Sequence, residues 1–229
     1  MADRFNGFSP LAPAFFEQLA VNNTKAWFEN HRDEYQELLL EPLKLLVSEL
    51  ADTMLALDPA LITLPAVDKT ISRIYRDTRF SHNKSPYKTC LWITFKRYSP
   101  DWKTAPCFFF EITADSYRYG MGFYSASRQT MDNLRRLIET KPARFRATVA
   151  WLAQQDAFEL AGDCYKRPLN AALPPDLQAW HCRKNIYLVC NREVDGLLFS
   201  KGLSDELAKG FRQLQPLYEL FWQMVQQGG

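Results

Sequence analysis

Six basic side chains and one acidic side chain lie between Lys69 and Lys88, in the sequence KTISRIYRDTRFSHNKSPYK, which we call the basic segment (69–88). The whole chain has a net charge of only +2, so the rest of it is net acidic. Arginine recognises carboxylate and phosphate groups because it presents several donors in one plane. The basic segment therefore predicts either an anion-binding site or a network of ion pairs.

The anion-site hypothesis uses both the cationic and the aromatic side chains of the segment. Arg79, Lys84 and Lys88 are the expected ligand contacts, because a loop predicted at 81–86 would bring them together. Asp77 is the only carboxylate, and nearby cations lower the pKa of such a group, so we expect an ion-pair partner rather than a general base. The predicted ligand-binding residues are Arg73, Tyr75, Arg76, Arg79, Lys84, Tyr87 and Lys88.

Two other functions would use the same residues. A nucleic-acid binding module would place the cations on phosphates and stack tyrosines, or Trp92, on bases. A structural or interaction protein would keep the arginines in internal ion pairs, for example with Asp77 or Glu111. The mild net charge makes nucleic acid the less favoured partner, so an anionic small molecule is preferred, with or without catalysis. The sequence decides neither whether the protein is an enzyme nor which cofactor it uses, and it predicts no metal site.

Part of the basic segment resembles a known family. The strings RIYRD, RFS and PYKT, together with an early pattern at Asn22–Phe28 and the helix around Pro216, resemble a bacterial and fungal family known as domain of unknown function 2461. The resemblance covers nearly the whole chain and implies a shared fold and a shared site, but no activity. Members usually have Lys-Asp where this chain has His82-Asn83. The matching residues are Arg73, Tyr75, Arg76, Asp77, Arg79, Phe80, Ser81, Lys84, Pro86, Tyr87, Lys88 and Thr89.

Other motifs favour structural roles. Gly120-Met121-Gly122 precedes a predicted helix, but the surroundings are not βαβ, so close packing of a strand against a helix is favoured over dinucleotide binding. His181 and Cys182 with Cys190 lack the spacing of a zinc site. Cys90 lies in an apolar run, where burial would raise its pKa and make it a poor nucleophile.

The residue periodicity predicts an α+β fold, with a mostly antiparallel sheet of about five strands covered by N-terminal, central and C-terminal helices. β-branched and aromatic runs predict strands at 71–76, 89–96, 107–113, 117–123 and 186–190. In the first of these, alternation would put Arg73 and Arg76 on opposite faces. Helical spacing predicts helices at 10–21, 24–41, 42–57, 127–138, 142–152 and 203–225.

One domain over 1–229 is expected, because no linker or repeat divides the chain. Its parts are a helical region (1–60), a strand meander with the basic segment (69–124), and helices with one returning strand (127–229). Five cysteines without a C-x-x-C pair indicate a reducing compartment and mostly buried thiols, and no long apolar run or leader is present. We therefore expect a cytoplasmic protein without a membrane span. The oligomeric state is not predictable.

Overall fold

The computed structural model describes residues 4–227, which form an α+β fold. Five strands make one antiparallel sheet in the order β1-β2-β3-β5-β4, and helices precede, interrupt and follow the strands along the chain, which confirms the predicted fold class. The strands are β1 (Leu91–Phe95), β2 (Pro106–Ile112), β3 (Ser116–Phe123), β4 (Glu159–Ala161) and β5 (Tyr187–Glu193).

The chain divides into two compact units. Unit 1 comprises 1–95, 109–119 and 191–209, and unit 2 comprises 96–108, 120–190 and 210–229. Strands β2, β3 and β5 and the last helix, α8 (Gly202–Gln226), each contribute residues to both units. No helix within residues 4–227 has both the length and the apolar character needed to cross a membrane.

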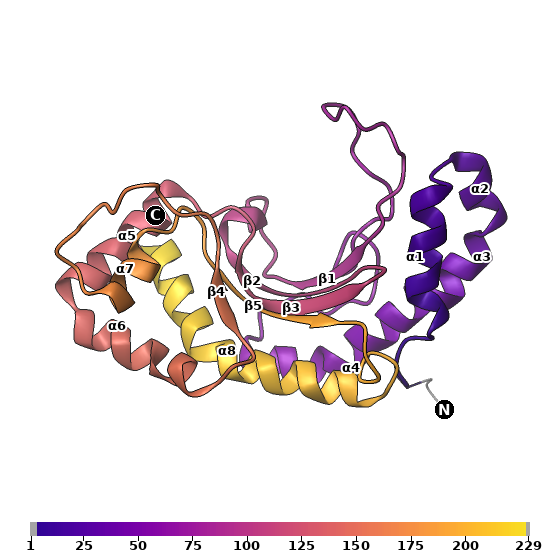
Figure 1. Cartoon of the computed structure of the whole chain (residues 1–229). Helices are drawn as coiled ribbons and strands as arrows, with labels where there is room; N and C mark the ends of the chain where they lie inside the picture. Colours follow the sequence, from indigo (N-terminus) through magenta and orange to yellow (C-terminus); the bar gives the residue numbers. More distant parts are fainter. Residues whose placement is uncertain (1–3, 228–229) are drawn as a thin grey trace. The chain divides into compact units, whose positions relative to one another are not determined.

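The N-terminal part of unit 1 is helical (Figure 1). Thr24 Oγ1 accepts a hydrogen bond from Trp27 N, and Pro42 comes two residues after a π-helical turn that continues directly into its helix. These helices are α1 (Leu11–Val21), α2 (Lys25–Asn30), α3 (Arg32–Tyr35) and α4 (Glu41–Leu57), with a π-helical turn at Gln36–Leu40.

The single helix predicted at 24–41 is wrong, because the chain leaves the helical conformation at His31. There the imidazole stacks on Trp27 at 4.0 Å between ring centroids, and Nδ1 lies 2.8 Å from the Trp27 carbonyl oxygen. A side chain that contacts this carbonyl competes with the backbone for it, which ends α2.

The strand predicted at 71–76 is also wrong. Only isolated bridges form there, from Ile71 to Val67 and to Ile93, and from Tyr75 to Tyr87. Ile71 and Ile74 are buried, a spacing of three rather than the two of a strand, and Arg73 is exposed. A turn before the segment, in which Asp68 has φ of 67° and its N–H donates to the Ile71 carbonyl, sets this path. The strand-face argument for the two arginines therefore fails.

Unit 2 contains α5 (Arg128–Thr140), α6 (Pro142–Val149), α7 (Pro175–His181) and the C-terminal part of α8, with short 3-10 turns at Trp102–Thr104 and Ala150–Gln154. Ser127 Oγ accepts from Thr130 N and caps α5 as the sequence predicts. Strand β4 and helix α7 have no predicted counterpart. β4 has three residues, too few for a periodic signal. In unit 2, Phe108 packs on Tyr218, and Phe123 packs on Phe221.

Candidate functional site

Four cations of the basic segment have partners: Arg73, Arg79, Lys84 and Lys88. Arg73 Nε lies 2.5 Å from Asp68 Oδ1, and Arg79 donates to both carboxylate oxygens of Asp77 at 2.9 and 2.7 Å. Lys84 Nζ donates to the Thr78 carbonyl at 2.9 Å. The arginine side chains of both ion pairs are mostly exposed, so these interactions order the loop but contribute little stability.

Asp77 is a stably ionised carboxylate. The hydrogen bonds from the Arg79 side chain and backbone lower the pKa of its carboxyl group to about 2. A carboxylate with so low a pKa holds a proton too weakly to act as a general base near neutral pH. Asp77 therefore serves as the partner of Arg79.

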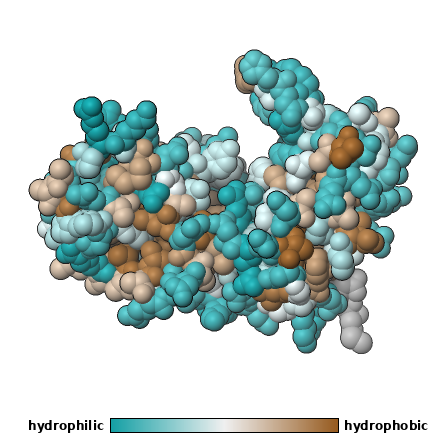
Figure 2. Space-filling view, in the orientation of Figure 1, coloured by the Kyte–Doolittle hydropathy of each residue, from teal (hydrophilic) through white to brown (hydrophobic). Residues whose placement is uncertain are grey.

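The chain between 76 and 86 forms a long loop that contains no helix or strand (Figure 1). In the space-filling view the projecting loop is mostly hydrophilic (Figure 2), in keeping with the exposed His82, Asn83 and Lys84. Phe80 is 94% exposed and is the exception.

Arg76 differs from its neighbours in having no carboxylate partner. Its side chain is half-buried, and its guanidinium makes one long contact, 3.5 Å from Ser81 Oγ. Within residues 4–227, no carboxylate lies within ion-pair distance of it. A half-buried guanidinium has lost part of its hydration, so an anion beside it would offset that cost.

Arg76 lines a pocket of about 280 Å³ in unit 1. Its wall contains a second cation, Lys88, and several neutral polar groups, but no carboxylate. Three residues of the predicted set line it: Arg76, Tyr87 and Lys88. Arg73, Tyr75, Arg79 and Lys84 do not. The lining residues are Ala20, Asn23, Arg76, Asn83, Ser85, Tyr87, Lys88, Thr89 and Cys90.

Lys88 is held in place at the pocket wall. Its Nζ donates to the Arg73 carbonyl at 2.5 Å and lies 4.4 Å from the centroid of the Trp92 ring. Burial lowers the pKa of its ammonium group. An anion bound beside Lys88 would favour its charged form and reverse part of this effect.

Asn23 also lines the pocket, and sequence reasoning did not select it as a site residue. Its side-chain amide donates to the Tyr87 carbonyl at 3.0 Å and accepts from Tyr87 N at 2.9 Å. The Asn23 amide thus pairs with both backbone polar groups of Tyr87, as a residue of a neighbouring strand would. The Tyr87 ring is buried and stacks on Phe28 at 4.2 Å. The only sequence signal for this brace was the family resemblance at Asn22–Phe28.

Tyr75 and Cys90 complete the surroundings. Tyr75 is half exposed, and its ring lies 5.2 Å from the buried ring of Tyr87. Burial raises the pKa of the Cys90 thiol, as the apolar sequence around it predicts. A thiol in this state is a weak nucleophile.

A second pocket, of about 520 Å³, lies in unit 2. Arg144, Trp151, Pro216 and Glu219 are among its lining residues, and Arg144 donates to Gln223 at 2.9 Å. One cation and one carboxylate cancel in this wall, so its charge favours no ionic ligand.

The remaining sequence candidates have structural explanations. Gly122 lies within β3, where an added Cβ would come 2.3 Å from Tyr187 Cβ, so the glycine allows close packing against β5, a strand and not the predicted helix. Cys182 lies beside Cys164 rather than Cys190. In the described part of the chain, residues 4–227, no three His, Cys, Asp or Glu side chains gather as metal ligands would.

A family model described as "Conserved hypothetical protein (DUF2461)" matches residues 12–220. The chain belongs to the DUF2461 family. A search of curated proteins finds no match.

The DUF2461 match includes every residue that lines the pocket of the basic segment. In this member Asn83 stands where the resemblance leads us to expect an aspartate. Its Oδ1 accepts from Ser85 N at 2.9 Å. The pocket wall therefore contains an amide and not a carboxylate at this position.

Proposed function

We propose that the pocket of the basic segment binds an anionic small molecule, bearing phosphate or carboxylate, through Arg76 and Lys88. The observation that carries this proposal is the composition of the wall, which has two cations and no carboxylate. Charge-assisted hydrogen bonds from arginine and lysine to such anions are stronger than neutral ones. Ser85 and Thr89 offer neutral polar groups beside the two cations.

The size of the pocket supports a small ligand. About 280 Å³ is just below the range for sites that hold drug-sized molecules, roughly 300–1,000 Å³. A phosphate or carboxylate head with a short body would fill it. The purely structural alternative accounts for Arg73 and Arg79, which have carboxylate partners, but it leaves Arg76 unexplained.

Isothermal titration calorimetry with inorganic phosphate, pyrophosphate, nucleotides and dicarboxylates tests the proposal. Arg76→Ala should weaken binding at least about tenfold, because a hydrogen bond to a charged group contributes roughly 1.5–3 kcal/mol. Arg79→Ala is the matched control, since this arginine belongs to the same segment but pairs with Asp77. It should change affinity less than about twofold.

The proposal fails if no anion binds, or if the Arg79 and Arg76 variants lose affinity equally. Binding of single-stranded oligonucleotides with steep salt dependence, without binding of small anions, would instead support the nucleic-acid alternative.

A further inference from the structure

Two thiols of unit 2 face each other. The Sγ atoms of Cys164 and Cys182 are 2.6 Å apart, although the residues are 18 positions apart in the sequence. This separation exceeds the length of a disulfide bond, about 2.0 Å, by only about 0.6 Å. Little movement is needed to join the two sulfurs.

The backbone on both sides of the pair is fixed. Cys164 forms an antiparallel bridge with Arg183. Tyr165 N donates to the Cys182 carbonyl at 2.8 Å, and Lys184 N donates to the Asp163 carbonyl at 2.6 Å. These bonds hold the segment after β4 against the end of α7, so the approach of the two thiols is a property of the fold.

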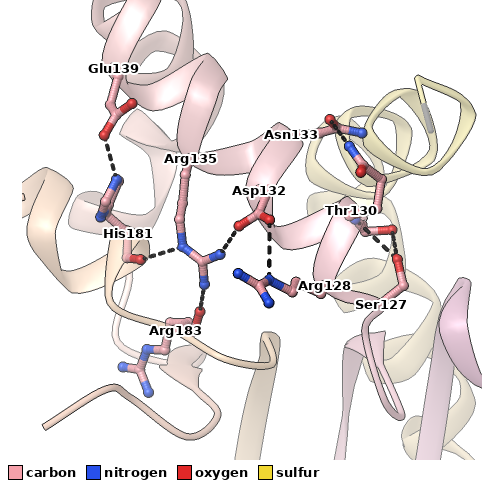
Figure 3. A network of polar contacts seen from close by, with 10 residues as sticks. Ser127, Arg128, Thr130, Asp132, Asn133, Arg135, Glu139, His181 and Arg183 are labelled. Atoms are coloured by element: carbon pink, nitrogen blue, oxygen red, sulfur yellow. Dashed lines mark hydrogen bonds and ion pairs between the residues drawn. The ribbon is translucent and has the colours of Figure 1, made fainter. Parts of the chain in front are cut away.

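Arg135 holds the Cys182 side from within α5 (Figure 3). Its buried guanidinium donates to the carbonyl oxygen of His181 at 3.2 Å and to that of Arg183 at 2.6 Å. These two carbonyls flank Cys182 directly. Asp132 accepts a further bond from Arg135 at 2.6 Å and completes the support.

The two thiols differ in access. Cys164 is exposed and Cys182 is partly buried, whereas Cys107 and Cys190 are buried. Only two of the five thiols are buried, so the prediction that most of them are buried is wrong. Burial and the contact with Cys164 raise the pKa of the Cys182 thiol. A reagent in solution therefore reaches Cys164 first, and Cys182 is placed to react second.

We propose that Cys164 and Cys182 form a redox-active dithiol, which a low-molecular-weight disulfide converts to an intramolecular disulfide. The Cys164 thiolate attacks one sulfur of the reagent, forming a mixed disulfide and releasing one thiol. Cys182 then loses its proton, attacks the Cys164 sulfur and releases the second thiol. The protein gives up two protons and two electrons, and the reagent takes up both as it becomes two thiols.

Oxidation of the full chain by oxidised glutathione tests this proposal. Free thiols counted after denaturation should fall from five to three, and peptide mapping should find residues 164 and 182 joined. Dithiothreitol should restore all five. The oxidised form should also melt several degrees higher, because the crosslink constrains the unfolded chain.

Three variants sharpen the result. Cys182→Ser should trap glutathione on Cys164, and Cys164→Ser should lose no thiols under the conditions that oxidise the natural chain. Cys90→Ser, which removes a partly buried cysteine of unit 1, is the control and should still form the crosslink. The proposal is overturned if the natural chain keeps five thiols, joins other cysteines, or stops at the mixed disulfide. Because these outcomes concern the natural chain, they stand even if a variant fails to fold.

Discussion

Arg76 in the basic segment is half-buried and Arg135 in α5 is buried, and the two guanidinium groups differ in how many hydrogen-bond acceptors surround them. Arg135 bonds to Asp132 and to two backbone carbonyls (Figure 3). It is 8% exposed, and its guanidinium lies 5.5 Å from the centroid of the Tyr165 ring. Arg76 has one long contact and lines a pocket. The fold supplies hydrogen-bond acceptors to Arg135, whereas most guanidinium donors of Arg76 have no acceptor within the described residues. Counting arginines therefore does not locate a site; the acceptors around each one do.

The two arginines nearest to Arg76 in the sequence, Arg73 and Arg79, have partners as Arg135 does, but they are exposed to solvent. Arg73 and Arg79 each have a carboxylate partner, but their side chains are 65% and 77% exposed. Water already satisfies most of their donors, so a ligand would gain little from them. Half-burial without a partner is what distinguishes Arg76.

The largest expected effect tests the structural side of the comparison. Arg135→Ala should lower the free energy of unfolding by about 3 kcal/mol, because it removes a buried side chain and leaves the carbonyls of His181 and Arg183 without their donor. Urea denaturation measures this. The neighbouring Arg136→Ala is the control, since Arg136 is exposed on the same helix, and should change stability by less than about 0.5 kcal/mol. If both variants lost the same free energy of unfolding, the hydrogen bonds of Arg135 would not distinguish it from an exposed arginine.

A smaller effect is expected at the brace of the pocket. Asn23→Ala should destabilise the chain by about 2 kcal/mol, because the backbone N–H and C=O of Tyr87 both lose their partner. Thermal or urea unfolding checks this. Asn22→Ala is the matched control, since the Asn22 side chain makes one exposed bond to the Gln18 carbonyl. If both variants were equally stable, Asn23 would not hold the pocket.

The smallest effect concerns the exposed pair of Asp77 and Arg79. The folded-state pKa of Asp77 is lowered to about 2, against about 3.9 in an unfolded chain. Its contribution to stability is therefore present above pH 4 and is lost as the pH falls toward 2. Carboxyl-carbon NMR should give a midpoint near 2, and Arg79→Ala should raise it toward 3.9. An unchanged midpoint would show that another group holds the carboxylate.

Local signals were enough to predict most elements. The Ser127 cap and the apolar face after it predicted α5, and β-branched and aromatic runs predicted β1, β2, β3 and β5. The same β-propensity misled at 71–76, because propensity does not register the turn at Asp68 that redirects the chain. Short elements such as β4 depend on their pairing with β5, which lies far away in the sequence.

The sequence predicted a site in the basic segment but not which of its residues line a pocket. Charge clustering favoured Arg79 and Lys84 as well as Lys88, and only the fold shows the partners of Arg79 and Lys84. Asn23 and Tyr87 are 64 residues apart, so no local pattern connects them. The acceptors of Arg135 include two backbone carbonyls, which residue types do not encode. Partners of these kinds become visible only when distant segments are placed together.

The most direct test of the anion pocket is a crystal structure grown with tungstate, a heavy anion that an anomalous difference map locates. The account predicts an anomalous peak within hydrogen-bond distance of the Arg76 guanidinium and Lys88 Nζ, and loss of that peak in Arg76→Ala. A pocket without tungstate, or peaks only beside Arg79 or Lys84, would contradict it.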